Sequence, residues 1–149
     1  MKYCNYSDIF DLIDRQTLLA LLDENNEFNI DIFDLFLQNT FHTDHAFIVT
    51  VIENSVKNAE SIVDGYCSPL YSVPFVTVPK IITMITVDLA IYDLFSRGQQ
   101  DMPEIRKERY NSAIDLLKKI NSGLLSLDIK KINQTVFISS NKPFNLEAF

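Results

Sequence analysis

Residues 78–98 read VPKIITMITVDLAIYDLFSRG, and this stretch decides the fold. Its apolar residues cover nearly the whole circumference of an α-helix: Ile81, Ile82, Met84, Ile85, Val87, Leu89, Ala90, Ile91, Tyr92, Leu94 and Phe95. Pro79 suits a helix start, where its missing N–H costs nothing, and Gly98 is a common stop. A helix that is apolar all round has to be covered on several sides. We therefore expect a central helix from Lys80 to Arg97.

A second long helix is expected before it, over residues 44–66. Apolar residues recur there at alternating steps of three and four, typical of one buried helical stripe: Val49, Ile52, Val56, Ala59, Val63 and Tyr66. Polar residues lie off that stripe and are expected in solvent: Glu53, Lys57, Glu60, Ser61 and Asp64. Gly65 and Pro69 mark the expected end. A proline-rich loop with Pro69, Pro74 and Pro79 then leads to the central helix.

A third long helix is expected from about Glu104 to Ser122, between Pro103 and Gly123. Its inward residues are Ala113, Ile114, Leu117 and Ile120. The prediction is thus an all-α fold, a compact bundle of three main helices with short N-terminal helices. We expect a helical domain over residues 1–129 and an extended C-terminal arm over residues 130–149. The arm contains one strand-like run, residues 135–139, and docks either on its own domain or on a neighbouring subunit.

Shorter elements precede the bundle. Ser7 is the expected N-cap of a helix in DIFDLID, and residues 17–23, TLLALLD, form a second short helix. Neither is long enough to be stable alone, so both must pack on the bundle. Residues 23–45 form an acidic, aromatic-rich insertion in which a further short helix is expected.

Length and composition limit the possible classes of protein. With 149 residues, 47% of them hydrophobic and 22% charged, the chain is large enough for one globular core. Only three glycines occur, which disfavours β-rich folds and phosphate-binding loops. Cys4 and Cys67 are expected as buried, reduced thiols. The first residues lack the apolar run of a signal peptide, and the longest apolar stretch is interrupted by charges, so we expect a cytoplasmic protein without a membrane span.

Charge is divided unevenly along the chain. Residues 1–64 carry twelve acidic and three basic side chains, a net charge of −9, whereas residues 65–149 have a net charge of +2. This distribution disfavours nucleic-acid binding, which requires clustered Lys and Arg. It fits head-to-tail self-association, in which an acidic face meets a neighbour's basic face. Two solvated surfaces of opposite sign explain it equally well.

Several residues are candidates for a metal or catalytic site, and each also has a simpler structural explanation. Residues 23–34 alternate acidic and amide side chains like a calcium loop, but Phe28 stands where the loop needs glycine. His42 and His45 lack further metal ligands, and Cys67 has no His beside it in sequence. For Asp88 and Asp93 on the central helix we expect structural pairing with one of four cations, Lys80, Arg97, Arg106 or Arg109. No catalytic or nucleotide-binding motif occurs, so we expect no enzyme, cofactor or metal.

The order of several short motifs between residues 59 and 127 resembles a family of small proteins from Mu-like phages and prophages. These motifs are Asp64-Gly65-Tyr66, a loop with Tyr71 and Pro74, then Pro79, Asp88-Leu89-Ala90-Ile91-Tyr92, Arg109-Tyr110, and an amphipathic helix that ends in Asn-Ser-Gly. Residues 24–45 are longer than the usual loop of that family. The arm after Ile129 also extends past the point where many members stop.

The resemblance implies a structural role at the head–tail connection, the neck, of a tailed phage. Proteins of similar helical plan form rings below the portal and use loops and a terminal arm to grip their neighbours. By this analogy the partners are other copies in a homo-oligomeric ring and the portal and tail-side phage proteins, in the bacterial cytoplasm and then in the virion.

The partner contacts implied in this way come from aromatic and aliphatic side chains: Tyr66, Leu70, Tyr71, Phe75, Phe137, Ile138 and Phe144. The alternative is that these residues only cover the core. Another function fits the same features, namely a small cytosolic helical binding module that regulates a host or phage protein.

Overall fold

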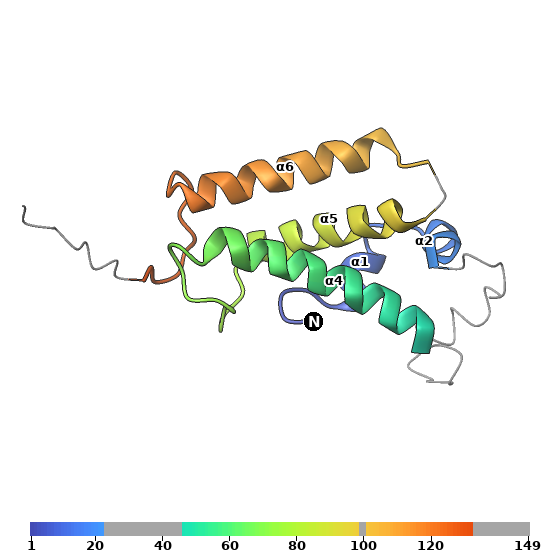
Figure 1. Ribbon diagram of the computed structural model, residues 1–149, viewed down its shortest axis with the longest axis horizontal. Coiled ribbons are helices and arrows are strands. Elements are labelled where there is room, and N and C mark those ends of the chain that lie inside the picture. Colours follow the sequence, from blue (N-terminus) through green and yellow to red (C-terminus); the bar gives the residue numbers. More distant parts are fainter. Residues whose placement is uncertain (23–45, 99–100, 133–149) are drawn as a thin grey trace, which may run out of the picture.

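The computed structural model describes residues 1–22, 46–98 and 101–132, which fold into one helical bundle (Figure 1). Five helices are described: α1 (Tyr6–Phe10), α2 (Arg15–Leu22), α4 (Ala46–Cys67), α5 (Lys80–Arg97) and α6 (Glu104–Asn121). Extended pairing within the described ranges is confined to an isolated antiparallel bridge between Tyr71 and Lys131. The predicted all-α bundle of three main helices is confirmed.

Helix α5 is the centre of the bundle, as its sequence predicted, and its bounds match the expected ones. It packs against α4, α6, α2 and α1. Nine of its residues are buried: Ile82, Ile85, Thr86, Val87, Leu89, Ala90, Ile91, Leu94 and Phe95. The one buried hydroxyl among them, that of Thr86, donates to the Ile82 carbonyl one turn earlier at 2.8 Å. An all-round apolar helix is therefore covered on several sides, as the physical reasoning required.

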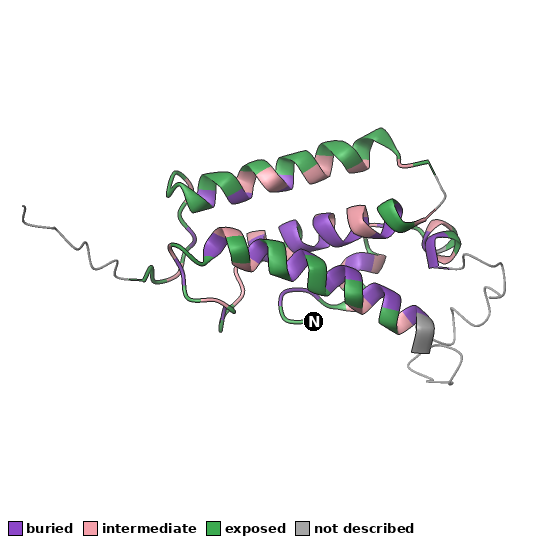
Figure 2. Ribbon diagram, in the orientation of Figure 1, coloured by how far each residue is buried: buried purple, intermediate pink, exposed green. Residues whose placement is uncertain are grey.

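Helix α4 turns its predicted stripe to α5. Ile52, Val56, Ala59 and Val63 are buried, and Val49 and Tyr66 at the two ends of the stripe are half-buried (Figure 2). The predicted end of this helix was wrong by one residue, because α4 continues through Gly65 to Cys67. Gly65 lies on the exposed side, where a Cβ would meet nothing within 4 Å. Gly65 therefore does not stop the helix.

Helix α6 is attached differently. Its buried residues are Ala113, Leu117 and Ile120, while Ile114, predicted to face inward, is half-buried. The Arg109 Nε donates to Asp88 Oδ1 at 2.7 Å, and the Tyr92 and Tyr110 rings stack with centroids 4.0 Å apart. Gly123 follows the helix with φ 77°, a conformation that favours glycine.

The first two helices close one side of the bundle. The predicted N-cap Ser7 was wrong: Asn5 caps α1, its side chain accepts from the Asp8 amide, and the Asp8 carboxylate accepts from the Asn5 amide. This reciprocal pair is a capping box. Helix α2 begins two residues earlier than predicted, after Asp14, whose carboxylate accepts from the Thr17 amide at 2.9 Å. Ile9, Leu18 and Leu22 reach the core.

Several predictions fall outside the described residues. These are the further short helix and the calcium-like alternation within residues 23–45, the His42 and His45 pair, and the strand-like run at residues 135–139.

Candidate functional site

Segments far apart in sequence meet at the end of the bundle where α4 and α6 finish and α5 begins (Figure 1). We call this region, residues 66–79 and 121–132, the loop end. The Asn121 side-chain amide donates to the Tyr66 carbonyl at 3.0 Å, and the Ile132 N–H donates to the Leu70 carbonyl at 2.9 Å. These hydrogen bonds join the segment after α4 to the segment after α6, so the two segments form one surface.

Tyr71 is the centre of the loop end. Its side chain is fully buried, and its hydroxyl accepts a hydrogen bond from the Leu127 N–H at 2.9 Å. Its own N–H donates back to the Cys67 carbonyl at the end of α4, also at 2.9 Å. Tyr71 therefore joins the end of α4 to the segment that follows α6.

Phe75 anchors the middle of the proline-rich loop. Its ring lies near Tyr3, with centroids 5.4 Å apart, and near Tyr71, with centroids 6.4 Å apart. The Phe75 N–H donates to the Tyr3 hydroxyl at 3.2 Å, and that hydroxyl donates in turn to Asp64 Oδ1. Burial and the neighbouring Asp64 carboxylate raise the pKa of Tyr3, so the hydroxyl stays protonated and able to donate.

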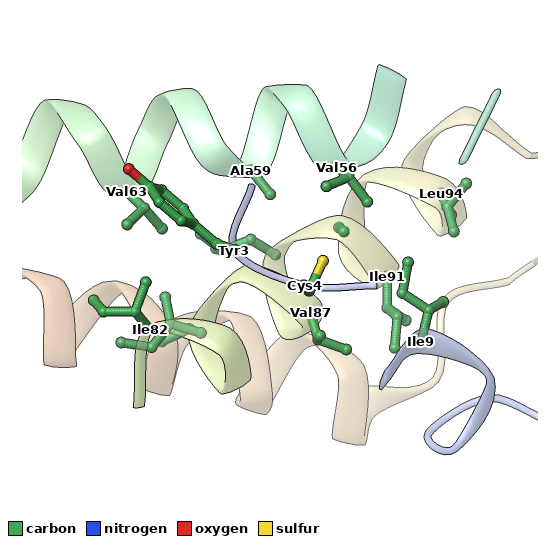
Figure 3. Close-up of a cluster of buried hydrophobic side chains, with 14 of the residues drawn as sticks. Tyr3, Cys4, Ile9, Val56, Ala59, Val63, Ile82, Val87, Ile91 and Leu94 are labelled. Atoms are coloured by element: carbon green, nitrogen blue, oxygen red, sulfur yellow. The ribbon is translucent and has the colours of Figure 1, made fainter. Parts of the chain in front are cut away.

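The residues before α1 run along α4, and Tyr3 and Cys4 join the buried cluster between α4 and α5 (Figure 3). The Lys2 and Tyr3 amides both donate to Glu60 Oε1, the latter at 3.1 Å. Glu60 was predicted to face solvent, but this segment covers it and leaves it 5% exposed. The helical period places Glu60 off the stripe and cannot show that another segment lies over it.

Beside the loop's anchor, apolar side chains stand in solvent. Val76 is fully exposed although the preceding Phe75 is 8% exposed, and Leu124 after α6 is 83% exposed. Ile132 is 46% exposed. Exposed lysines surround this end, at the last turn of α6 and beside the Tyr71 bridge: Lys118, Lys119, Lys130 and Lys131. The loop end therefore offers apolar tips among amines, an arrangement suited to a protein partner with an acidic rim.

The predicted contact residues are distributed unevenly. Tyr66 and Leu70 are half-buried at the loop end. Tyr71 and Phe75 are buried, so they are not the exposed anchors that the sequence suggested; they cover the core, as the alternative stated. Phe137, Ile138 and Phe144 lie outside the described residues.

Sequence reasoning missed Val76 and Leu124, the two most exposed large apolar side chains of the described residues. The exposure of Val76 could have been inferred from its neighbour Phe75. In an extended loop, successive side chains point in opposite directions, so an anchored Phe75 places its neighbour outward.

The two carboxylates of the central helix have different partners. Asp88 pairs with Arg109, one of the four predicted cations, and this structural role is confirmed. The prediction of a cationic partner for Asp93 was wrong. The Asp93 carboxylate accepts a hydrogen bond from the Asn58 side-chain amide at 3.5 Å.

Both cysteines are free and buried, as predicted. Burial raises the pKa of Cys4 to about 12 and that of Cys67 to about 11. Both thiols are therefore protonated near neutral pH, which makes them poor nucleophiles.

In residues 1–22, 46–98 and 101–132, His, Cys, Asp and Glu side chains form no group of three or more that could hold a metal ion. None of the helices described there combines the length and apolar character that crossing a membrane requires.

The family model described as bacteriophage Mu, Gp36, matches residues 3–144 of the chain. The chain belongs to this family. The predicted resemblance to a family of Mu-like phages is confirmed, and this Gp36-family chain is accordingly a phage protein. A search of curated proteins found no significant match.

Proposed function

We propose that this Gp36-family chain is a structural subunit of the phage particle, a head–tail connector or neck protein that assembles as a ring on the portal. The observation that carries the proposal is the loop end, where a buried framework holds the exposed apolar side chains of Val76 and Leu124. The family match supports the coarser part of the proposal, that the chain is a phage protein. The chain works in the host cytoplasm during assembly and then in the virion.

The proposed contacts follow from the loop-end geometry. Val76 and Leu124 serve as apolar anchors, and Tyr66 and Leu70 add contact area at the same end. Their fixed positions reduce the conformational entropy that binding would otherwise cost. Four exposed lysines steer the surface toward an acidic face, on the portal, on a tail-side protein or on another copy.

The composition of the particle tests the role. Tailed particles from the phage that encodes this chain would be purified, and the chain quantified by mass spectrometry against the major capsid protein. A single closed ring predicts a small, fixed number of copies per particle, because cyclic symmetry sets the number of subunits. Absence from intact infectious particles would refute the proposal and leave the regulatory binding module as the better function.

A matched pair of variants tests the surface. In a phage that lacks the gene and is complemented in trans, Val76→Asp should reduce the yield of tailed particles by at least about tenfold, as expected when an apolar interface anchor is replaced by a charge. Ile105→Asp is the control, because Ile105 is 57% exposed but lies in the first turn of α6, away from the loop end. Equal yields from both variants would exclude the loop end as the contact.

A further inference from the structure

We infer that Tyr3 is a positioning residue: its hydroxyl ties residues 1–4 to the proline-rich loop and sets the direction in which Val76 projects. Residues 1–4, hereafter the strap, lie along α4 (Figure 3), and Tyr3 contacts Phe75 of the loop. The family match gives no role to these residues. The inference deepens the proposed function, because a loop that binds a partner has to be held in one place.

The loop has little support of its own. Residues 72–78 connect Tyr71 to Pro79, and within the described residues their backbone makes its one hydrogen bond through the Phe75 N–H, to the Tyr3 hydroxyl at 3.2 Å. The ends of the segment are fixed by α4 and α5, but its middle is fixed by this bond and by the Phe75 ring. The tilted ring contact of Phe75 is made with the same strap residue, Tyr3.

The Tyr3 hydroxyl makes two hydrogen bonds, one with the loop and one with α4. It accepts from the Phe75 N–H and donates its single proton to the Asp64 carboxylate on α4. Asp64 in turn belongs to a helix whose Glu60 holds the Lys2 and Tyr3 amides. The strap is thus fastened to α4 at Glu60 and Asp64, and the loop is fastened to the strap. No backbone bond joins the described residues 72–78 directly to α4.

Replacing Tyr3 by phenylalanine removes the hydrogen bonds of its hydroxyl but keeps the packing of its ring. The ring and its contact with Phe75 remain, while the buried Phe75 N–H loses its acceptor and Asp64 loses a donor. A buried amide without a partner is costly, so the loop gains by turning that N–H toward water. Val76, the next residue, changes direction with it.

Amide hydrogen exchange on the isolated chain tests this first. In Tyr3→Phe we expect exchange at the Phe75 amide to rise by about fivefold, the factor that corresponds to the loss of one hydrogen bond of about 1 kcal/mol. Exchange in the middle of α4, α5 and α6 should stay as in the wild type. Tyr6→Phe is the matched control, because the Tyr6 hydroxyl also contacts a carboxylate of α4, Glu53, at 3.2 Å, but away from the loop.

Two outcomes would overturn the inference. One is an exchange pattern in Tyr3→Phe that matches Tyr6→Phe at residues 72–78. The other is a uniform rise over all helices, which would make Tyr3 an ordinary core residue.

A double-mutant cycle on particle yield then links position to function. Tyr3→Phe should lower the yield in the wild-type background and have no further effect beside Val76→Asp, because both changes remove the same projecting contact. Independent, multiplying losses would contradict positioning through Val76. Normal yield from Val76→Asp together with the expected exchange change would refute the proposed contact surface but leave the strap's hold on the loop established.

Discussion

The central helix α5 has two main neighbours, α4 and α6, and each is held against it by a different kind of contact. On the α4 side the contact is made by buried aliphatic residues such as Val56 and Val63 (Figure 3), and Ile52 of the same stripe is also fully buried. On the α6 side three residues of α6 are buried, and two specific contacts with α5 add to them, the Arg109–Asp88 pair and the Tyr92–Tyr110 stack. Arg106 of α6 also donates a hydrogen bond to the Leu12 carbonyl, between α1 and α2. Burial of apolar area therefore holds α4 against α5, whereas an ion pair and a ring stack fix the position of α6.

The largest expected effect comes from the α4 side. Ile52 is fully buried, so Ile52→Ala removes apolar contact and leaves a cavity. We expect the free energy of unfolding to fall by about 2–5 kcal/mol, measured by urea denaturation followed by circular dichroism. A loss below about 1 kcal/mol would mean that the α4–α5 contact is loosely packed and would remove the distinction between the two sides.

A smaller effect is expected on the α6 side. The Asp88 side chain is 10% exposed and that of Arg109 is 36% exposed, so Asp88→Ala leaves a cation that can still reach water. We expect a loss of about 1–3 kcal/mol in the free energy of unfolding. A double-mutant cycle with Arg109→Ala, measured in the same urea experiment, should give a coupling energy of about 1 kcal/mol, and additive losses would show that the pair contributes nothing beyond packing.

This contrast explains which parts of the fold could be predicted from sequence. The bounds of α5 follow from Pro79 and Gly98, which suit the start and the end of a helix. The stripe of α4 follows from periodicity, because apolar burial on one side imposes a helical period on the sequence. The partner of Asp88 could be narrowed to four cations, since a carboxylate in apolar surroundings needs one. Which cation it is depends on the rotation of α6 about its axis, and that rotation is set by tertiary contacts.

The candidate contact residues chosen from the sequence differ from the side chains that the loop end exposes. Family resemblance pointed to the loop end, yet Tyr71 and Phe75 are buried there and Val76 and Leu124 are exposed. Large aromatic side chains attract attention as contact residues, but they bury the most area in the core as well. The strap was not predicted, because contacts between Tyr3 and residues about sixty to seventy positions later leave no periodic signal.

The buried thiols predict an alkaline limit to stability. Burial raises the pKa of Cys67 to about 11 and that of Cys4 to about 12, above the value of about 9 for a thiol in the unfolded chain. A raised pKa of this kind leaves stability intact below pH 9 and reduces it as pH rises through 11 and 12. Urea denaturation at pH 8 and pH 10 should show a graded fall in the free energy of unfolding. The fall should be smaller in a Cys4→Ala, Cys67→Ala variant, and an equal fall would assign it to other groups.

The smallest effect is expected on the outer face of α6. Lys118 Nζ lies 3.3 Å from Asp115 Oδ1, with side chains 62% and 65% exposed, so water and salt screen the pair. Lys118→Ala should change the free energy of unfolding by less than about 0.5 kcal/mol, and added salt should reduce even that. Lys107→Ala, which breaks the similar Lys107–Glu104 pair in the first turn, is the control and should behave alike. A loss near that of Asp88→Ala would mean that surface charges help to hold α6, and the contrast between its inner and outer contacts would fail.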